Sequence, residues 1–221
     1  MQRFPGVAAA VFPKEPERAV YNNAVLDRGL AAAERADAIE AMEDAYAAAG
    51  VTRYAAWVAE SDGAMQDDLE RRGYTIAECT RSMGMTLDEF RSPRPQIELG
   101  PPDWAEYVRL LGMPPHFLRR ADPAAYHVLV GRDGGESVAT AMAFDHAGDC
   151  GIFNVTTLEH ARRRGLGTAL TALLLHDALA RGCGTATLQS TPMAEGLYAR
   201  IGFRDLGRIL EYARLTPPSE S

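Results

Sequence analysis

Residues 152–182 place a strand, a glycine-containing loop and a helix in direct succession, and no other part of the chain restricts the fold as strongly. The stretch "IFNVTTL" carries the β-branched and aromatic residues typical of a strand. Three arginines and a Gly-Leu-Gly follow, and a leucine-rich helical pattern then runs to Gly182, where we expect the helix to end. Such a unit predicts a sheet with helices packed on it.

The segments on both sides of this unit predict a mixed sheet. A helix capped by Asp103 comes first, and the turn "GRDGGE" joins two strand-like runs after it. Beyond Gly182 we expect a strand, a short helix that starts with Pro192, and a final strand. The expected strands are residues 127–130, 137–144, 150–158, 185–190 and 206–215. This pattern assigns the chain to the α/β (α+β) class, with a mixed central sheet flanked by helices.

The first half of the chain weakly repeats this order. "VYNNAVL" at 20–26 is similar to "IFNVTTL" at 152–158. Residues 61–74 align without gaps on residues 190–203, with three identical positions. The order strand, helix, strand, helix, strand is expected in both halves. An ancient duplication explains the repeat, and chance similarity between two α/β segments is the alternative.

The loop before the leucine-rich helix has the properties of an anion-binding site. The first turn of a helix has free backbone N–H groups and a positive dipole end. Gly165 and Gly167 would let a ligand approach the backbone closely. Three adjacent arginines are unfavourable at this end of a helix unless an anion such as a pyrophosphate lies between them. A solvated arginine run, with the glycines serving tight packing, is the alternative.

Two common phosphate motifs do not match. A Walker loop needs a lysine after its last glycine, and here Thr168 follows Gly167 directly. A Rossmann fingerprint needs a third glycine where Leu170 stands, and an acidic residue about 20 residues further on. The sequence there reads "TLQST", so both motifs are excluded.

The string "RRRGLG" after "FNVTTLEHA" resembles the R/Q-x-x-G-x-G/A acetyl-CoA signature of the GNAT superfamily of N-acetyltransferases. "GLYARIGF" at 196–203 resembles the later "xxLYxxxGF" element of that family, and Tyr198 follows Gly167 by 31 residues. The resemblance covers residues 96–215. It implies the GNAT fold and acetyl-CoA as co-substrate, and it says almost nothing about the acceptor.

The resemblance also implies a cofactor site. The strand segment would pair through its backbone with the pantetheine arm and donate an N–H group to the acetyl carbonyl. The loop would bind the pyrophosphate through backbone N–H groups and the side chains of Arg163 and Arg164. The side chains of Thr156 and Thr157 need no role in binding, because the strand propensity of threonine alone explains their presence. The implied cofactor-binding residues are Val155, Thr156, Thr157, Arg162, Arg163, Arg164, Gly165, Leu166, Gly167, Thr168 and Ala169.

Tyr198 matches the family position whose hydroxyl protonates the leaving thiolate, and the alternative is a tyrosine of the core. Several family members carry a carboxylate base on the preceding strand, but Gln189 stands at that place here. Glu211, Asp145, His116 or a water relay could substitute for it.

The first half lacks the loop signature and has Leu69 in the aligned position of the tyrosine. We therefore expect a degenerate GNAT-like region that is structural or walls one side of the acceptor pocket. "RSPRPQ" at 91–96 is interpreted as a linker. The predicted division is a degenerate N-terminal region at 1–95, a catalytic GNAT domain at 96–216 and a flexible tail at 217–221.

Composition excludes several other classes. A net charge of −7 argues against broad nucleic-acid binding. No apolar run approaches the ~18 residues of a membrane span, and the N-terminus does not resemble a signal peptide. The cysteines, which are Cys79, Cys150 and Cys183, form no disulfide or metal motif. A cytoplasmic protein without a metal is therefore expected.

Together these patterns predict an acetyl-CoA-dependent N-acetyltransferase that acts on a primary amine. A small-molecule acceptor is favoured over a protein amine, since an additional N-terminal segment tends to close a pocket. An acyltransferase with another acceptor is one alternative, and a non-catalytic CoA- or ligand-binding module of the same fold is the other. A homodimer is compatible with the sequence.

Overall fold

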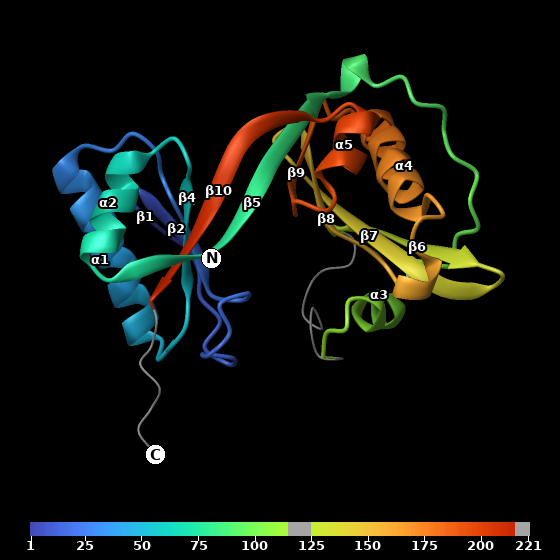
Figure 1. Cartoon of the computed structure of the whole chain (residues 1–221). Helices are drawn as coiled ribbons and strands as arrows, with labels where there is room; N and C mark the ends of the chain where they lie inside the picture. The colour runs from blue at the N-terminus through green and yellow to red at the C-terminus, as the bar shows by residue number, and fades with distance from the viewer. Residues whose placement is uncertain (115–124, 215–221) are drawn as a thin grey trace. The chain divides into compact units, whose positions relative to one another are not determined.

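A computed structural model describes residues 1–114 and 125–214 of the chain (Figure 1). The chain forms two compact units. Unit 1 contains Met1–Arg81 and the chain from Gly207 onward, and unit 2 contains Ser82–Leu206. Both units combine a sheet with helices, which confirms the predicted α+β class. Among the described residues, no helix combines the length and the apolar character needed to cross a bilayer.

Unit 2 is built on a mixed sheet in the order β5-β9-β8-β7-β6. Pairs β6–β7 and β7–β8 are antiparallel, and the β8–β9 pair is parallel. A parallel step needs a crossover connection, which helix α4 supplies. The strands are β5 (Tyr74–Thr86, which begins in unit 1), β6 (His127–Asp133), β7 (Glu136–His146), β8 (Asp149–Thr157) and β9 (Thr185–Ser190).

Helices cover both faces of this sheet (Figure 1). Successive residues of β7 point to opposite faces. Ala141 belongs to the core with α4 and α5, whereas Met142 packs against Tyr107 of α3. Two 3₁₀ turns accompany them at Leu87–Glu89 and Glu159–Ala161. The helices are α3 (Trp104–Leu110), α4 (Leu166–Arg181) and α5 (Glu195–Ile201).

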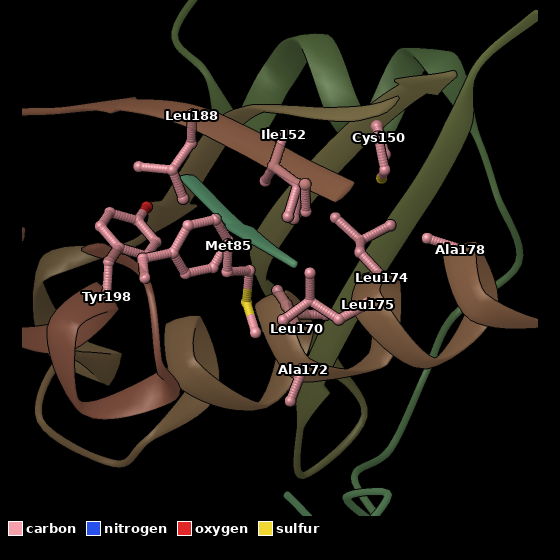
Figure 2. Packing of buried hydrophobic residues seen from close by; sticks show 14 of the residues in the cluster. Met85, Cys150, Ile152, Leu170, Ala172, Leu174, Leu175, Ala178, Leu188 and Tyr198 are labelled. Atoms are coloured by element: carbon pink, nitrogen blue, oxygen red, sulfur yellow. The ribbon is translucent and has the colours of Figure 1, made fainter. Parts of the chain in front are cut away.

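The core of unit 2 lies between α4 and the sheet. Figure 2 shows leucines of α4 beside side chains of β8 and β9. The leucines of α4 are Leu170, Leu174 and Leu175, and the strand residues are Cys150 and Ile152 of β8 and Leu188 of β9. The leucine-rich helix that the sequence predicts before Gly182 is therefore confirmed, and these leucines face the sheet. Gly182 ends α4 in a left-handed conformation, with φ at 89°. Asp103 caps α3, and its carboxylate accepts the N–H of Ala105 at 2.8 Å.

Unit 1 has a sheet in the order β1-β2-β3-β4-β10-β5. Its first three strands are antiparallel neighbours, and β3 is parallel to β4. Side chains from α1 and α2 pack with strand residues in a separate core. The elements are β1 (Gln2–Phe4), β2 (Val7–Ala10), β3 (Asn23–Leu26), α1 (Ala32–Ala48), β4 (Ala55–Ala59), α2 (Gly63–Arg71) and β10 (Arg204–Arg214).

The two units repeat one topology. The series β1-β2-β3-β4 and β6-β7-β8-β9 each contain two antiparallel steps followed by one parallel step. The expected order strand, helix, strand, helix, strand occurs in both halves. The final strands are exchanged, because β10 follows α5 along the chain but pairs with β4 in unit 1. Likewise, β5 follows α2 but neighbours β9 in unit 2.

The compact units divide at positions other than the predicted boundary at 95/96. The segment 91–98 has no regular structure, yet it lies inside unit 2 and does not link the units. The backbone N–H of Arg132 donates to the carbonyl of Glu98 at 2.8 Å, which ties the end of this segment to β6. β10 belongs mainly to unit 1 because it pairs with β4. The predicted tail at 217–221 lies outside the described residues.

The exchanged strand should be essential for the stability of unit 1. Tyr212 of β10 is fully buried in the core of unit 1, and its hydroxyl donates to Glu70 at 3.0 Å. We expect Tyr212→Ala to reduce the free energy of unfolding by about 3–5 kcal/mol, as measured by urea denaturation. Leu206→Ala is the control, because this residue of the same strand is 59% exposed. Equal losses for the two variants would contradict the assignment of β10 to the core of unit 1.

Candidate functional site

Strands β8 and β9 separate at one end. Their pairing stops at Ile152 and Leu188, although β8 continues to Thr157. A β-bulge lies just beyond this point, and there Asn154 has a positive φ of 53°. The Asn154 side-chain amide donates to the Tyr107 hydroxyl at 2.7 Å, which links the bulge to α3. The edge of β8 facing β9 is thus open from residue 153 onward, so its backbone can pair with an extended ligand.

The N-terminus of α4 carries a run of free backbone donors. Among the described residues, the N–H groups of 163–168 have no hydrogen-bond partner. Gly165 is the N-cap in a left-handed conformation with φ at 80°, and no side chain caps the helix. Arg163 is also left-handed, with φ at 63°. Such a turn at a helix N-terminus can bind an anion through its N–H groups.

The loop, the open strand and α5 meet at Gly167. A Cβ placed on Gly167 would lie 3.7 Å from Val155 Cγ1, 3.8 Å from Leu197 Cδ1 and 3.9 Å from Thr157 Oγ1. Leu197 directly precedes Tyr198 on α5. The structure therefore brings together the strand segment, the arginine loop and the tyrosine helix that the sequence singled out separately.

The predicted cofactor residues differ in exposure. The Leu166 side chain is buried in the core of unit 2, so only its backbone remains for a ligand. Thr156, Gly167 and Ala169 are partly exposed. The residues with exposed side chains or backbone are Arg162, Arg163, Arg164, Gly165 and Thr168. The arginine side chains thus lie on the surface beside the free N–H groups.

Tyr198 lies at the edge of the core. It is 7% exposed, and its ring packs edge-on against Phe203 with centroids 5.9 Å apart. Figure 2 shows the ring among buried apolar side chains of unit 2. The hydroxyl has no hydrogen-bond partner among the described residues. Burial raises the pKa of Tyr198, so the hydroxyl is protonated at neutral pH.

Among the described residues of unit 2, no side chain is identified as the base. Asp145 lies on β7 opposite Cys150, and its hydrogen bond from Arg181 lowers the pKa of the carboxyl. A carboxylate held in this way is a weak base, which removes Asp145 from consideration. Gln189 is exposed on β9. Burial raises the pKa of Glu211, but this residue belongs to unit 1, and His116 lies outside the described residues.

Sequence reasoning missed Asn154, Tyr107 and Asp133. Asparagine tolerates a positive φ better than most residues, so "FNVTT" contained a weak signal for the bulge. Nothing local indicated that Tyr107 would bind Asn154, or that Asp133 would pair with Arg164.

Comparisons with known proteins agree with this geometry. Residues 87–203 match the model of the "Acetyltransferase (GNAT) family". A GCN5-related N-acetyltransferase from Kribbella flavida superposes with a TM-score of 0.71 at 22% identity, over 89% of this chain and 82% of that one. A second GCN5-related N-acetyltransferase, from Sphaerobacter thermophilus, superposes with a TM-score of 0.70 at 20% identity, over 95% of this chain and 76% of that one. A tandem GNAT protein from the clavulanic acid biosynthesis pathway gives 0.61 at 16% identity, over 90% and 76%. The comparison with curated protein sequences found no match.

Proposed function

This chain belongs to the acetyltransferase (GNAT) family, and we propose that it transfers the acetyl group of acetyl-CoA to a primary amine. The proposal rests chiefly on the free N–H groups of 163–168, which lie next to the open edge of β8. The N–H run suits a pyrophosphate, and the strand edge suits the amide-containing pantetheine arm. Both are parts of one CoA molecule, which explains why the chain places them together.

The residues of unit 2 suit direct attack by the amine. A neutral amine nitrogen forms a bond to the thioester carbon, and the carbonyl oxygen takes up the electron pair. Backbone N–H groups at Val155–Thr157 would stabilise this oxyanion. The C–S bond then breaks, and Tyr198 would give its proton to the thiolate. The amine nitrogen loses a proton in turn, and we assign that step to no residue.

A small-molecule amine remains the acceptor that we propose, because the chain contains a second folded unit in addition to the GNAT-matching residues. We propose that unit 1 is a degenerate GNAT-like unit. Its repeated topology supports this, and the tandem GNAT structure covers both units. The repeat also favours a duplication over chance similarity, although the duplication itself stays a prediction.

Release of free CoA provides the direct test. Wild-type protein is incubated with acetyl-CoA and a panel of small amines, amino sugars, polyamines, lysine peptides and amine-free alcohols, and the new thiol is measured. We expect amine-dependent release with at least one small amine, and acetylated product of matching mass. CoA binding without release for any amine would favour the non-catalytic module. Release with alcohols alone would favour an acyltransferase with another acceptor.

We expect one CoA site per chain. In unit 1 two of the protein's own carboxylates accept backbone N–H groups at and just before the start of the corresponding helix α1. Glu34 accepts the N–H of Ala31 at 2.8 Å, and Asp62 accepts the N–H of Gly29 at 3.1 Å. Carboxylates at this end of the helix repel phosphate. Leu69 also aligns with Tyr198 in the sequence.

Isothermal titration calorimetry with CoA should therefore give a stoichiometry near one. A Glu34→Gln, Asp62→Asn double variant serves as the comparison, because it removes both carboxylate charges from the N-terminal end of α1. Two sites in the wild-type protein would contradict the assignment of the cofactor site to unit 2 alone.

A further inference from the structure

We propose that Asp133 tunes the affinity for CoA by holding the Arg164 guanidinium, so that Arg163 is the arginine that meets the cofactor phosphate. Asp133 lies at the end of β6 and had no predicted role. This inference rests on the proposed CoA site in unit 2. The inference gives each of the three arginines at 162–164 a different role, although the run looks uniform in sequence.

The three arginines have three different environments. The Arg162 side chain donates from Nε to the carbonyl of Thr157 at 3.2 Å, which braces the loop against the end of β8. Arg164 forms an ion pair with Asp133 and also reaches the carbonyl of His160 at 3.5 Å. Arg163 has neither a hydrogen bond nor an ion pair among the described residues. Of the three, Arg163 is therefore the one whose whole guanidinium is available to a phosphate.

The turn between β6 and β7 explains why a carboxylate stands at this place. Gly134 and Gly135 both have positive φ, of 60° and 83°, which closes a two-residue hairpin turn. The turn makes Asp133 and Glu136 cross-strand neighbours. Both face the loop, since Glu136 lies 3.7 Å from His160 and Asp133 pairs with Arg164. The hairpin thus presents two carboxylates to the segment that leads into α4.

A carboxylate at this position weakens phosphate binding in two ways. It neutralises Arg164, and it repels an incoming anion. The Arg164 and Asp133 side chains are 57% and 42% exposed, so salt screens the pair and its strength is modest. A modest, screened pair can adjust the affinity of a site without closing it.

The test compares the CoA dissociation constants of three single variants by calorimetry at low and high salt. Asp133→Asn is expected to tighten CoA binding by about 2–5-fold at low salt, and high salt should reduce this gain. Asp177→Asn is the matched control. It makes the same charge change and removes another exposed ion pair, that of Asp177 with Arg94. Asp177 follows Leu166 by eleven residues along α4, so it lies about 16 Å from the start of the helix. Arg163→Gln should weaken binding by about 10-fold or more.

A double variant tests whether Asp133 affects CoA binding through Arg164. In an Arg164→Gln background, the gain in CoA affinity from Asp133→Asn should shrink to the gain from Asp177→Asn. Asp133 and the phosphate then no longer compete for Arg164. Arg164→Gln by itself should weaken CoA binding less than Arg163→Gln. The kinetic readout is a lower KM for acetyl-CoA at unchanged kcat in Asp133→Asn.

Weaker binding in Asp133→Asn would overturn the proposal, since it would mean that Asp133 orients Arg164 toward the phosphate. A gain no larger than that of Asp177→Asn, or one that persists without Arg164, would also overturn it. If wild-type protein does not bind CoA, the proposed function fails first and this inference fails with it. CoA binding that is intact but insensitive to Asp133 contradicts only the inference.

Discussion

Gly167→Glu is expected to abolish CoA binding while unit 2 stays folded. The side chain would start 3.7–3.9 Å from Val155, Leu197 and Thr157, which are ordinary contact distances. Gly167 lies in the first turn of α4, where Glu has a higher helix propensity than Gly by roughly 0.5–1 kcal/mol. A carboxylate near the N-terminus of a helix is also favourable, by about 0.3–1 kcal/mol. The variant should therefore be as stable as the wild type.

The loss of binding has two causes. The new carboxylate would compete for the free N–H groups of 163–168, as Glu34 occupies the N-terminus of α1. It would also oppose the pyrophosphate charge, and juxtaposed like charges cost several kcal/mol. We expect the CoA dissociation constant to rise by at least about 100-fold.

Gly63→Glu in unit 1 is the matched control, because Gly63 starts α2 and a Cβ there meets nothing within 4 Å. Calorimetry measures the affinity and thermal unfolding checks the fold. A folded Gly167→Glu protein with wild-type affinity for CoA would show that the pyrophosphate does not bind at this loop.

Tyr198→Phe is expected to slow the chemical step by about 10²–10⁴-fold at unchanged acetyl-CoA affinity. The ring packs against Phe203, and phenylalanine preserves that contact. The hydroxyl has no partner among the described residues, so its removal leaves no unsatisfied group within the protein. Since burial raises the pKa of Tyr198, ionisation of this acid should limit the rate only above the ordinary tyrosine range.

Single-turnover acetyl transfer, with an amine identified in the panel, measures this step. Tyr46→Phe is the control, because it removes a buried tyrosine hydroxyl from unit 1, where the group donates to the Ala10 carbonyl at 3.2 Å. A near-wild-type rate for Tyr198→Phe when chemistry limits turnover would make Tyr198 a core residue and leave protonation of the thiolate to water.

Several features followed from the sequence because they depend on neighbouring residues. The leucine spacing of α4 and the stop at Gly182 are local, as is the Asp103 cap of α3. The loop signature and the tyrosine element predicted the GNAT fold, which the family match and the structures confirm. The roles of the site residues stay predictions.

The tertiary structure alone decided which strands exchange partners and which arginine is free. β10 pairs with β4 and β5 neighbours β9, so the chain divides at Arg81 and Leu206 and not at the proline-rich segment. Asp133 precedes Arg164 by 31 residues, and Tyr107 precedes Asn154 by 47. Strand pairing and side-chain contacts over such separations depend on the packing of the whole sheet. Local propensity contains no information on them, whereas helix periodicity and caps are determined within a few turns of the chain.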